Sequence, residues 1–122
     1  PTHAFVAEFL GRVNRLARNA DALARGVVKL GGVEWACPAP AIGAGVLVRP
    51  EDVQIGPRRP DWAAATVRHR TFLGERIHLR LEADGQPPLV ADVARDSPFK
   101  VGDVVGLWVA PDRLMASMES DA

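Results

Sequence analysis

Residues 76–82, with the sequence RIHLRLE, alternate apolar and polar side chains without a break. Successive side chains of a β-strand point to opposite faces, so Ile77, Leu79 and Leu81 share one face while the polar residues share the other. An amphipathic helix would instead repeat its apolar residues every three to four positions. The stretch therefore predicts a half-buried strand with one face on a core.

Turn signals bracket this strand and extend the pattern in both directions. Leu73-Gly74-Glu75 precedes it and follows a Thr- and Arg-bearing strand predicted over 64–72. Asp84-Gly85 follows it, and apolar residues then alternate again at 89, 91 and 93. Glycine and aspartate favour tight turns because they tolerate the backbone angles that turns require. We therefore expect three consecutive strands joined by short turns.

Further strands are predicted on either side of this group. Residues 27–30 and 33–35 flank Gly31-Gly32, and a Gly-Gly pair permits the positive φ angles of a hairpin turn. Residues 45–48 form a short apolar strand that Pro50 ends. Residues 104–109 are apolar on both faces of the strand that they would form, which predicts that both faces are covered.

The N-terminal segment has a different period. Thr2 can cap a short helix whose apolar residues, from Phe5 to Leu10, fall on one face, and Gly11 stands where a helix would end. Beyond Gly11 the helical period disappears, and Gly and Pro punctuate short apolar runs. We expect an all-β fold, a small barrel or sandwich over 12–116, with one short N-terminal helix over 1–11 and a frayed tail over 117–122.

Composition narrows the function. The formal charge is zero, whereas dedicated binders of nucleic acids or anionic membranes carry a basic excess or a basic face. No apolar run reaches the roughly 18–20 residues that cross a bilayer, and no secretory signal is present at the start. The single Cys37 is expected to be a small buried hydrophobe in a reducing compartment. The chain begins at Pro1, as an excerpt or a processed product would.

The residue types that carry chemistry do not fall into a functional pattern. The three histidines and Cys37 show no zinc-ligand spacing. None of the serines stands in a G-x-S-x-G turn, and no G-x-x-x-x-G-K-[ST] phosphate loop occurs. Glu51 and Asp52 follow Pro50, an order typical of the first turn of a short helix. We expect no catalytic, cofactor-binding or metal-binding residue in this chain.

A basic cluster and the tryptophans are the remaining candidates. Acidic residues interleave with the cluster, which favours a solvated, charge-mixed sheet face over a nucleic-acid groove. The cluster comprises Arg68, His69, Arg70, Arg76 and Arg80. Trp108, within an apolar strand, is expected in the core. Trp62, beside the exposed loop 56–61, is a candidate partner surface.

Several segments together resemble the ATP-binding subunits of ABC importers. The sequence FVAEFLG at 5–11, followed by Asn14, resembles the junction where the nucleotide-binding domain meets its C-terminal extension. VLVRPEDV at 46–53, FLGER at 72–76 and FKVGDVV at 99–105, followed by Leu107-Trp108, are similar to the transport-associated OB (TOBE) domain. Importers for polyamines, ferric iron, sulfate and maltose-type sugars carry that domain.

The resemblance implies an OB-type regulatory domain at 12–116, reached from an upstream nucleotide-binding domain through the helix at 1–11. It implies a cytoplasmic homodimer bound to permease subunits at the inner membrane face, with ATP and Mg²⁺ in the upstream domain. No catalytic residue is carried over. Arg49, Pro50 and Glu51 match the family's motif; Pro50 would begin a turn and Arg49 would pair with a nearby acid. Arg49 and Glu51 are also candidates for the dimer surface.

Two alternatives remain open. Ala17-Arg18-Asn19, with Gly26 and Val27 further on, faintly resembles the Ser-Ala-Arg-Asn…Gly-x-Val pattern of molybdate-binding domains, although Leu16 replaces the serine and the glycine is too distant. This resemblance implies a free-standing module that binds small oxyanions. A module that binds single-stranded nucleic acid is the other alternative, and its affinity would fall steeply with salt.

Overall fold

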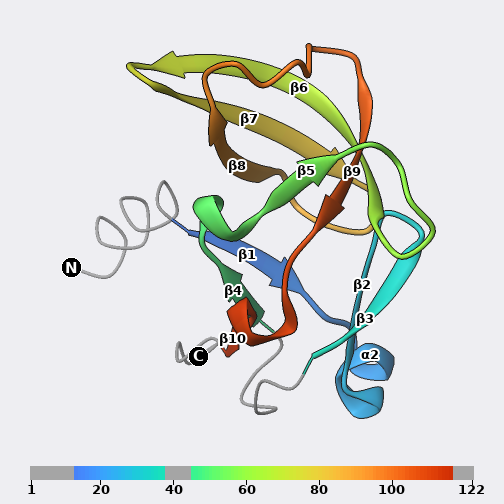
Figure 1. The fold of residues 1–122 in the computed structure, drawn as a ribbon. Helices are drawn as coiled ribbons and strands as arrows, with labels where there is room; N and C mark the ends of the chain where they lie inside the picture. Colours follow the sequence, from blue (N-terminus) through green and yellow to red (C-terminus); the bar gives the residue numbers. More distant parts are fainter. Residues whose placement is uncertain (1–12, 38–44, 117–122) are drawn as a thin grey trace.

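The computed structural model describes residues 13–37 and 45–116, and the 76–82 stretch lies in a five-stranded antiparallel sheet (Figure 1). The strand order is β5-β9-β6-β7-β8, so β5 and β8 form the edges. Its members are β5 (Gln54–Gly56), β6 (Ala63–Leu73), β7 (Arg76–Ala83), β8 (Leu89–Ala94) and β9 (Val104–Trp108).

Two smaller antiparallel sheets complete the strands. One has the order β1-β4-β10 and the other is the hairpin β2-β3. They comprise β1 (Asn14–Ala17), β2 (Val27–Leu30), β3 (Val33–Ala36), β4 (Gly45–Val48) and β10 (Met115–Ala116). The helical elements are α2 (Ala20–Arg25) and two 3-10 turns, η1 (Pro50–Asp52) and η2 (Pro111–Arg113). The all-β prediction is confirmed.

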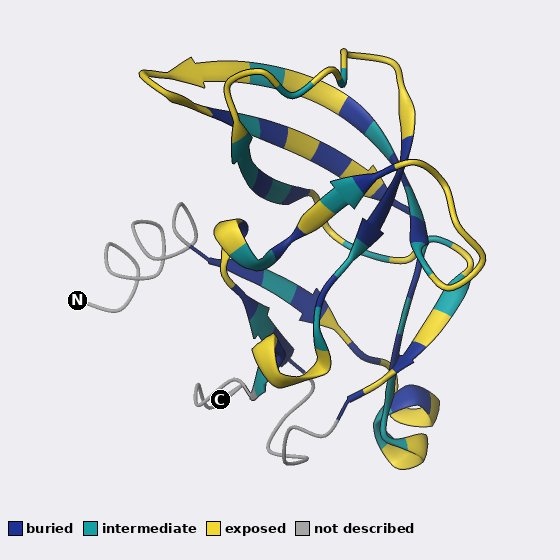
Figure 2. Ribbon diagram, viewed as in Figure 1, coloured by how far each residue is buried: buried dark blue, intermediate teal, exposed yellow. Residues whose placement is uncertain are grey.

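The predicted alternation of β7 is confirmed. Ile77, Leu79 and Leu81 are fully buried, whereas Arg76, Arg80 and Glu82 are exposed, so buried and exposed segments alternate along this strand (Figure 2). The neighbouring β6 keeps this alternation only as far as Val67, where a β-bulge interrupts its register with β7. Beyond the bulge the strand leaves the core, and Phe72 and Leu73 are exposed.

The β2-β3 hairpin forms where the Gly-Gly pair predicts it. Gly31 and Gly32 have φ angles of 54° and 84°, and Leu30 pairs directly with Val33. Gly31 also lies against the large sheet, because its N–H donates to Asp84 O and its carbonyl accepts from Ala64 N. A Cβ at this position would lie 2.5 Å from Ala64 O, so the close approach itself requires glycine.

Helix α2 contradicts the expectation that helical structure ends near Gly11. Its six residues are too few to show an apolar period, but both of its ends carry capping signals. The Asn19 side chain accepts a hydrogen bond from Ala22 N at 2.8 Å, and Gly26 adopts the left-handed conformation with φ 67°. The sequence feature that indicates this helix is therefore the pair of capping residues, Asn19 and Gly26, and not an apolar periodicity.

Two side-chain amides join β1 to the edge of the large sheet. Asn14 donates to Val90 O (2.8 Å) and accepts from Val90 N (2.7 Å). Gln86, in the turn between β7 and β8, accepts from Ala17 N (2.7 Å) and donates to Ala17 O (2.9 Å) and to Lys29 O (2.7 Å). The amides thus satisfy backbone groups that an additional strand would otherwise pair.

A single apolar core lies between the three sheets, because every sheet contributes buried residues to it. Cys37 belongs to this core with 6% of its surface exposed, as expected for a small hydrophobe. The largest fully buried side chains are Leu16, Leu30, Ile77, Leu79, Leu81, Leu89, Leu107, Val28, Val46, Val48 and Val67.

The expectation that both faces of 104–109 are covered is wrong in part. Val105, Leu107 and Val109 are buried, but Val104 is 52% exposed and Trp108 is half-buried at the core edge. Val104 and Trp108 alternate along the strand with Val105, Leu107 and Val109, so they lie on the opposite face of the sheet from these core residues. The predicted helix at 1–11 and tail at 117–122 lie outside the described residues, and the boundary at 11/12 remains a prediction.

Replacing Asn14 by leucine should test the amide connection. Asn14→Leu keeps the branched shape of the side chain but leaves the N–H and C=O of Val90 without their partner, and we expect a loss of about 2–4 kcal/mol in unfolding free energy. Gln54→Leu, at an exposed position of the edge strand β5, is the matched control and should change it by about 0.5 kcal/mol or less. Urea denaturation followed by tryptophan fluorescence measures both. Equal losses in the two variants would contradict the assigned role of Asn14.

Candidate functional site

The three residues predicted at a partner surface occupy two places. Arg49 and Glu51 are exposed at η1, and Pro50 between them is buried and begins the short helical turn as predicted. Trp62 follows the loop at the other end of β5 (Figure 1). Strand β5 lies between the two places in the chain. The interpretation of these residues as a partner surface remains a prediction.

The local ion pair expected for Arg49 is not found. Within 13–37 and 45–116, no hydrogen bond or ion pair involves the Arg49 side chain, and its backbone carbonyl accepts from Asp52 N at 2.9 Å. An exposed guanidinium gains little from one fixed carboxylate, because water solvates both charges.

Trp62 packs within the fold, although the sequence also makes it a candidate for a partner surface. Its ring stacks on that of Trp108 with a centroid distance of 6.0 Å, and the Arg59 guanidinium lies 4.6 Å from its centroid. Gly56 and Gly106 pair across β5 and β9, and a Cβ on either would approach the Trp62 ring to 3.2 Å. Because neither glycine has a side chain, the indole ring of Trp62 can lie flat against the paired strands. These two glycines are the sequence feature that could have indicated this packing.

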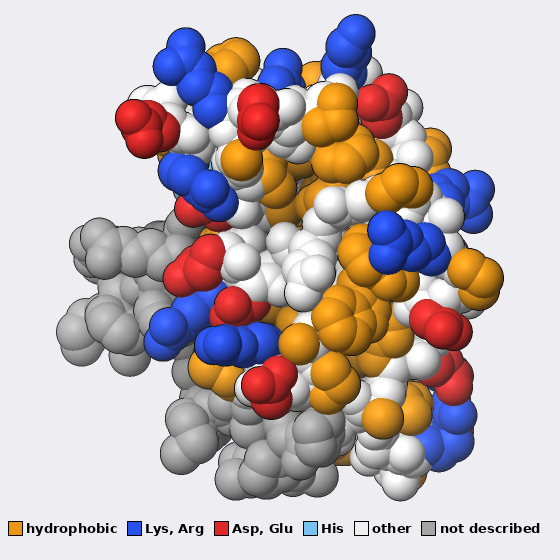
Figure 3. All heavy atoms as spheres, in the orientation of Figure 1, with side chains coloured by type: hydrophobic (Ala, Val, Ile, Leu, Met, Phe, Trp, Pro, Cys, Tyr) orange, Lys and Arg blue, Asp and Glu red, His pale blue; other side chains and the backbone are white. Residues whose placement is uncertain are grey.

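The basic cluster lies on a face of mixed charge. Arg68 pairs with Glu82 at 2.9 Å and Arg76 with Asp92 at 2.7 Å, while Arg70 donates to Ser97 O at 3.1 Å. Figure 3 shows basic and acidic side chains interspersed around apolar ones on the face it presents. The pairings of Arg68 and Arg76 with acidic residues support the interpretation of a solvated, charge-mixed face.

A cavity of about 620 Å³ opens where the three sheets meet. The end of β1, helix α2, the β2-β3 hairpin and the turn between β7 and β8 enclose it. Gln86 fixes two of these walls, since it bonds to the backbone of both Ala17 and Lys29. The lining residues with polar side chains are Arg18, Asn19, Lys29, Glu34, Asp84 and Gln86.

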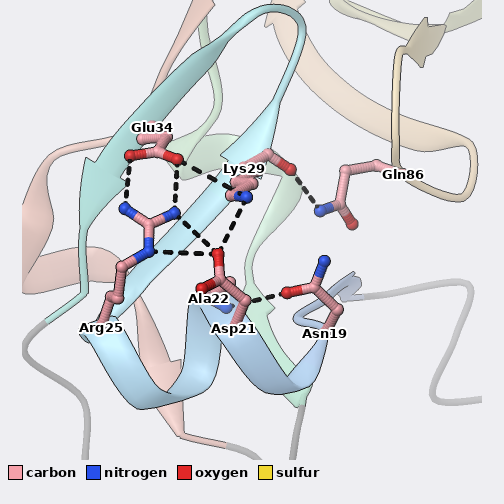
Figure 4. Close-up of polar contacts among 7 residues, drawn as sticks. All are labelled: Asn19, Asp21, Ala22, Arg25, Lys29, Glu34 and Gln86. Carbon is pink, nitrogen blue, oxygen red and sulfur yellow. Dashed lines mark hydrogen bonds and ion pairs between the residues drawn. The ribbon is translucent and has the colours of Figure 1, made fainter.

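One rim of the cavity carries a network of four charges (Figure 4). Arg25 binds both oxygens of Glu34, at 3.1 and 2.7 Å, and contacts Asp21 at 3.0 Å. Lys29 contacts Asp21 at 3.2 Å and Glu34 at 3.7 Å. Hydrogen bonds from Arg25 and then from Lys29 lower the pKa of Asp21, and the hydrogen bonds from Arg25 lower the pKa of Glu34. The network joins α2 to the β2-β3 hairpin.

Arg18 lies in the wall of the same cavity and is 6% exposed. Its Nε is buried and has no hydrogen-bond partner, and its side chain enters no ion pair within the described ranges. Sequence reasoning noted Arg18 through the faint Ala17-Arg18-Asn19 resemblance, but only the fold places it in a cavity.

We also searched the described residues for a metal site and for a membrane-spanning helix. No three side chains of His, Cys, Asp or Glu gather there as metal ligands would. In the same ranges, no helix reaches the length and hydropathy of a membrane-spanning segment.

Comparison with known proteins decides the family. The TOBE domain family matches residues 46–116, which is more than half of the chain. The chain belongs to the TOBE domain family. It is also 36% identical over 107 residues to the Fe(3+) ions import ATP-binding protein FbpC of Streptomyces coelicolor. That similarity covers 88% of this chain but 30% of the relative, so the chain spans about a third of the relative's length.

Family membership bears out the expectation of an OB-type domain. The matched range of the TOBE domain includes η1, Trp62 and Gln86. Arg18, α2 and the β2-β3 hairpin precede it, so the cavity combines residues inside and outside the matched range.

Removing Arg25 should release both carboxyl groups of the rim network. In Arg25→Gln, the pKa of Asp21 and of Glu34 should rise toward their ordinary values of 3.8 and 4.5. Because folding lowers these pKa values, their stabilising effect is complete above the unfolded-state pKa and is lost as pH falls through the folded-state pKa. Carboxyl-carbon NMR titration measures the shifts.

Arg58→Gln is the control for the Arg25 titration, since Arg58 is exposed in the loop after β5. It should leave both pKa values where they are in the native protein. Unchanged values in Arg25→Gln would show that Arg25 does not hold the two carboxylates.

Proposed function

We propose that this chain is the C-terminal regulatory and dimerisation domain of the ATP-binding subunit of an ABC-type solute importer. The observation that carries the proposal is the similarity to the import ATP-binding protein FbpC, which spans 88% of this chain and 30% of that relative. The order of the matched segments, with a TOBE domain at 46–116, supports the same assignment.

Catalysis would reside elsewhere in the same polypeptide. This chain has no G-x-x-x-x-G-K-[ST] loop, so ATP and Mg²⁺ would be held by an upstream nucleotide-binding domain. The subunit would act as a transport ATPase, whereas the TOBE domain contributes no catalytic residue. Permease subunits would be its partners, and the assembly would lie at the inner face of the cell membrane, with this domain in the cytoplasm.

Regulation would act through contacts between two copies of the domain. A rigid domain can bias an equilibrium between open and closed ATPase states only if its contacts differ between those states. The side-chain amides that join β1 to the large sheet supply such rigidity. Arg49, which is exposed and forms no ion pair with another described residue, and the neighbouring Glu51 are the candidates for state-dependent contacts. Trp62 follows the loop at the opposite end of β5.

The coding sequence upstream of Pro1 tests the parentage. We expect an open frame of about 200–250 residues that carries G-x-x-x-x-G-K-[ST] after a predicted strand. Permease genes nearby would then indicate the solute. A frame that begins with Met at or just before Pro1 would contradict the proposal and leave a free-standing OB-type module.

Charge reversal at η1 tests the regulatory contact in the full-length subunit. Arg49→Glu should change the ATPase rate or the dimer dissociation constant severalfold, because state-dependent interface contacts contribute coupling of this size. Arg95→Glu, an exposed arginine after β8, is the matched control and should change neither. ATPase assays and analytical ultracentrifugation give the two readouts. Identical behaviour of the two variants would remove Arg49 from the interface.

A further inference from the structure

Strand β3 is the outer strand of the β2-β3 hairpin, and no described strand pairs with its second side. Just beyond the hairpin ladder, the N–H of Cys37 donates to Gly26 O, which makes these two residues a hydrogen-bonded pair. Hydrogen-bonded and non-hydrogen-bonded pairs alternate along an antiparallel ladder. Glu34 and Ala36 therefore belong to non-hydrogen-bonded pairs, and their N–H and C=O groups point away from β2.

A groove of about 450 Å³ opens beside this edge of β3. Strand β3 lines one side of the groove, and the end of β9 with η2 lines the other. Figure 3 shows apolar side chains gathered between the positions that β9 and β3 have in Figure 1. The apolar lining residues are Val33, Trp35, Ala36, Trp108, Val109, Pro111 and Leu114. An apolar groove beside a strand edge is suited to an extended peptide, because alternate side chains of the peptide can enter it.

The two charged residues that line the groove, Glu34 and Asp61, are both acidic and exposed. The Nε1 of Trp35 donates to Asp61 O at 3.1 Å, which fixes the backbone that carries this carboxylate. Arg25 pairs with Glu34 and offsets its charge, whereas no described residue forms an ion pair with Asp61. A basic side chain on a bound peptide would therefore complement the charge of the groove at Asp61.

We infer that the β3 edge and its groove bind an extended, basic segment of a partner protein, which adds to the β2-β3 hairpin as a third strand. Main-chain hydrogen bonds to Glu34 and Ala36 contribute the affinity. Apolar side chains of the segment contact Trp108 and Pro111, and a basic side chain pairs with Asp61. The inference stands on this chain alone and does not depend on its place in a transport ATPase.

The charges of the groove favour such a segment over a second copy of this chain. If two copies paired through their β3 edges, Glu34 and Asp61 of one copy would approach the same acidic residues of the other. Like charges on neighbouring strands are destabilising. Exposed charges on an edge strand also deter uncontrolled pairing. A basic segment turns the same charges into attractive contacts.

Binding of a labelled peptide to the 122-residue chain tests the inference. The probe is a fluorescein-labelled peptide of seven residues that alternates arginine with valine, and its counterpart alternates glutamate with valine. Fluorescence anisotropy measures the dissociation constants. We expect the arginine peptide to bind about tenfold more tightly or better, and Asp61→Lys to weaken its binding about tenfold. The matched control Asp96→Lys, in the exposed turn after β8, should bind the peptide normally.

Two readouts on the native chain identify strand addition. The N–H groups of Glu34 and Ala36 should gain protection from hydrogen exchange when the arginine peptide binds, as measured by NMR. N-methylation of one alternate set of peptide amides should abolish binding and N-methylation of the other set should not, because only alternate amides of a strand face its neighbour. Ala36→Pro should also weaken binding about tenfold, because it removes an outward N–H while leaving the bonds to β2 in place.

Three results would overturn the inference. The first is a native chain that binds neither peptide, or binds both with equal affinity. The second is an equal effect of the two N-methylated sets, which indicates contacts through side chains without strand addition. The third is self-association of the native chain that Ala36→Pro abolishes, since this outcome assigns the β3 edge to a second copy.

Discussion

The side-chain amides of Asn14 and Gln86 form the hydrogen bonds that the backbone of an additional β-strand would otherwise form. Each bonds to both the N–H and the C=O of one backbone residue, Val90 for Asn14 and Ala17 for Gln86. Strand β8 is the edge of the five-stranded sheet, and an unpaired edge invites association with other chains. By fixing β1 against this edge, the amides bring the small sheet over the core of the large one. The arrangement of the hairpin, α2 and the cavity depends on that connection.

The cavity follows from this closure. Gln86 uses its remaining amide hydrogen on Lys29 O, and Gly31 approaches Ala64 so closely that only glycine fits. The hairpin is thereby held beside the β7-β8 turn, and Arg18 at the end of β1 is enclosed between them. Burial of an unpaired guanidinium opposes stability.

The TOBE assignment and the structure divide the surface between two roles. Around η1, Arg49 and Glu51 are exposed, and they are the residues that we propose for a contact with another subunit. At the β2-β3 hairpin, Arg25 forms ion pairs with Asp21 and Glu34, and these pairs connect α2 to the hairpin. Trp62 belongs to the fold more than to either surface, since Trp108 and two glycines position it.

The sequence by itself determined the strands whose signal is local. The alternation of 76–82, the Gly31-Gly32 turn, and the Pro50-Glu51-Asp52 turn each depend on neighbouring residues, and the structure contains all three. Tertiary structure decided the features that depend on distant partners: the amides of Asn14 and Gln86, the seat of Trp62 on Gly56 and Gly106, and the burial of Arg18. Val104 shows the same limit, because whether the second face of an apolar strand is covered depends on which other elements pack against that face. Local patterns fix backbone conformation, whereas contacts between residues far apart in sequence fix which polar groups find partners.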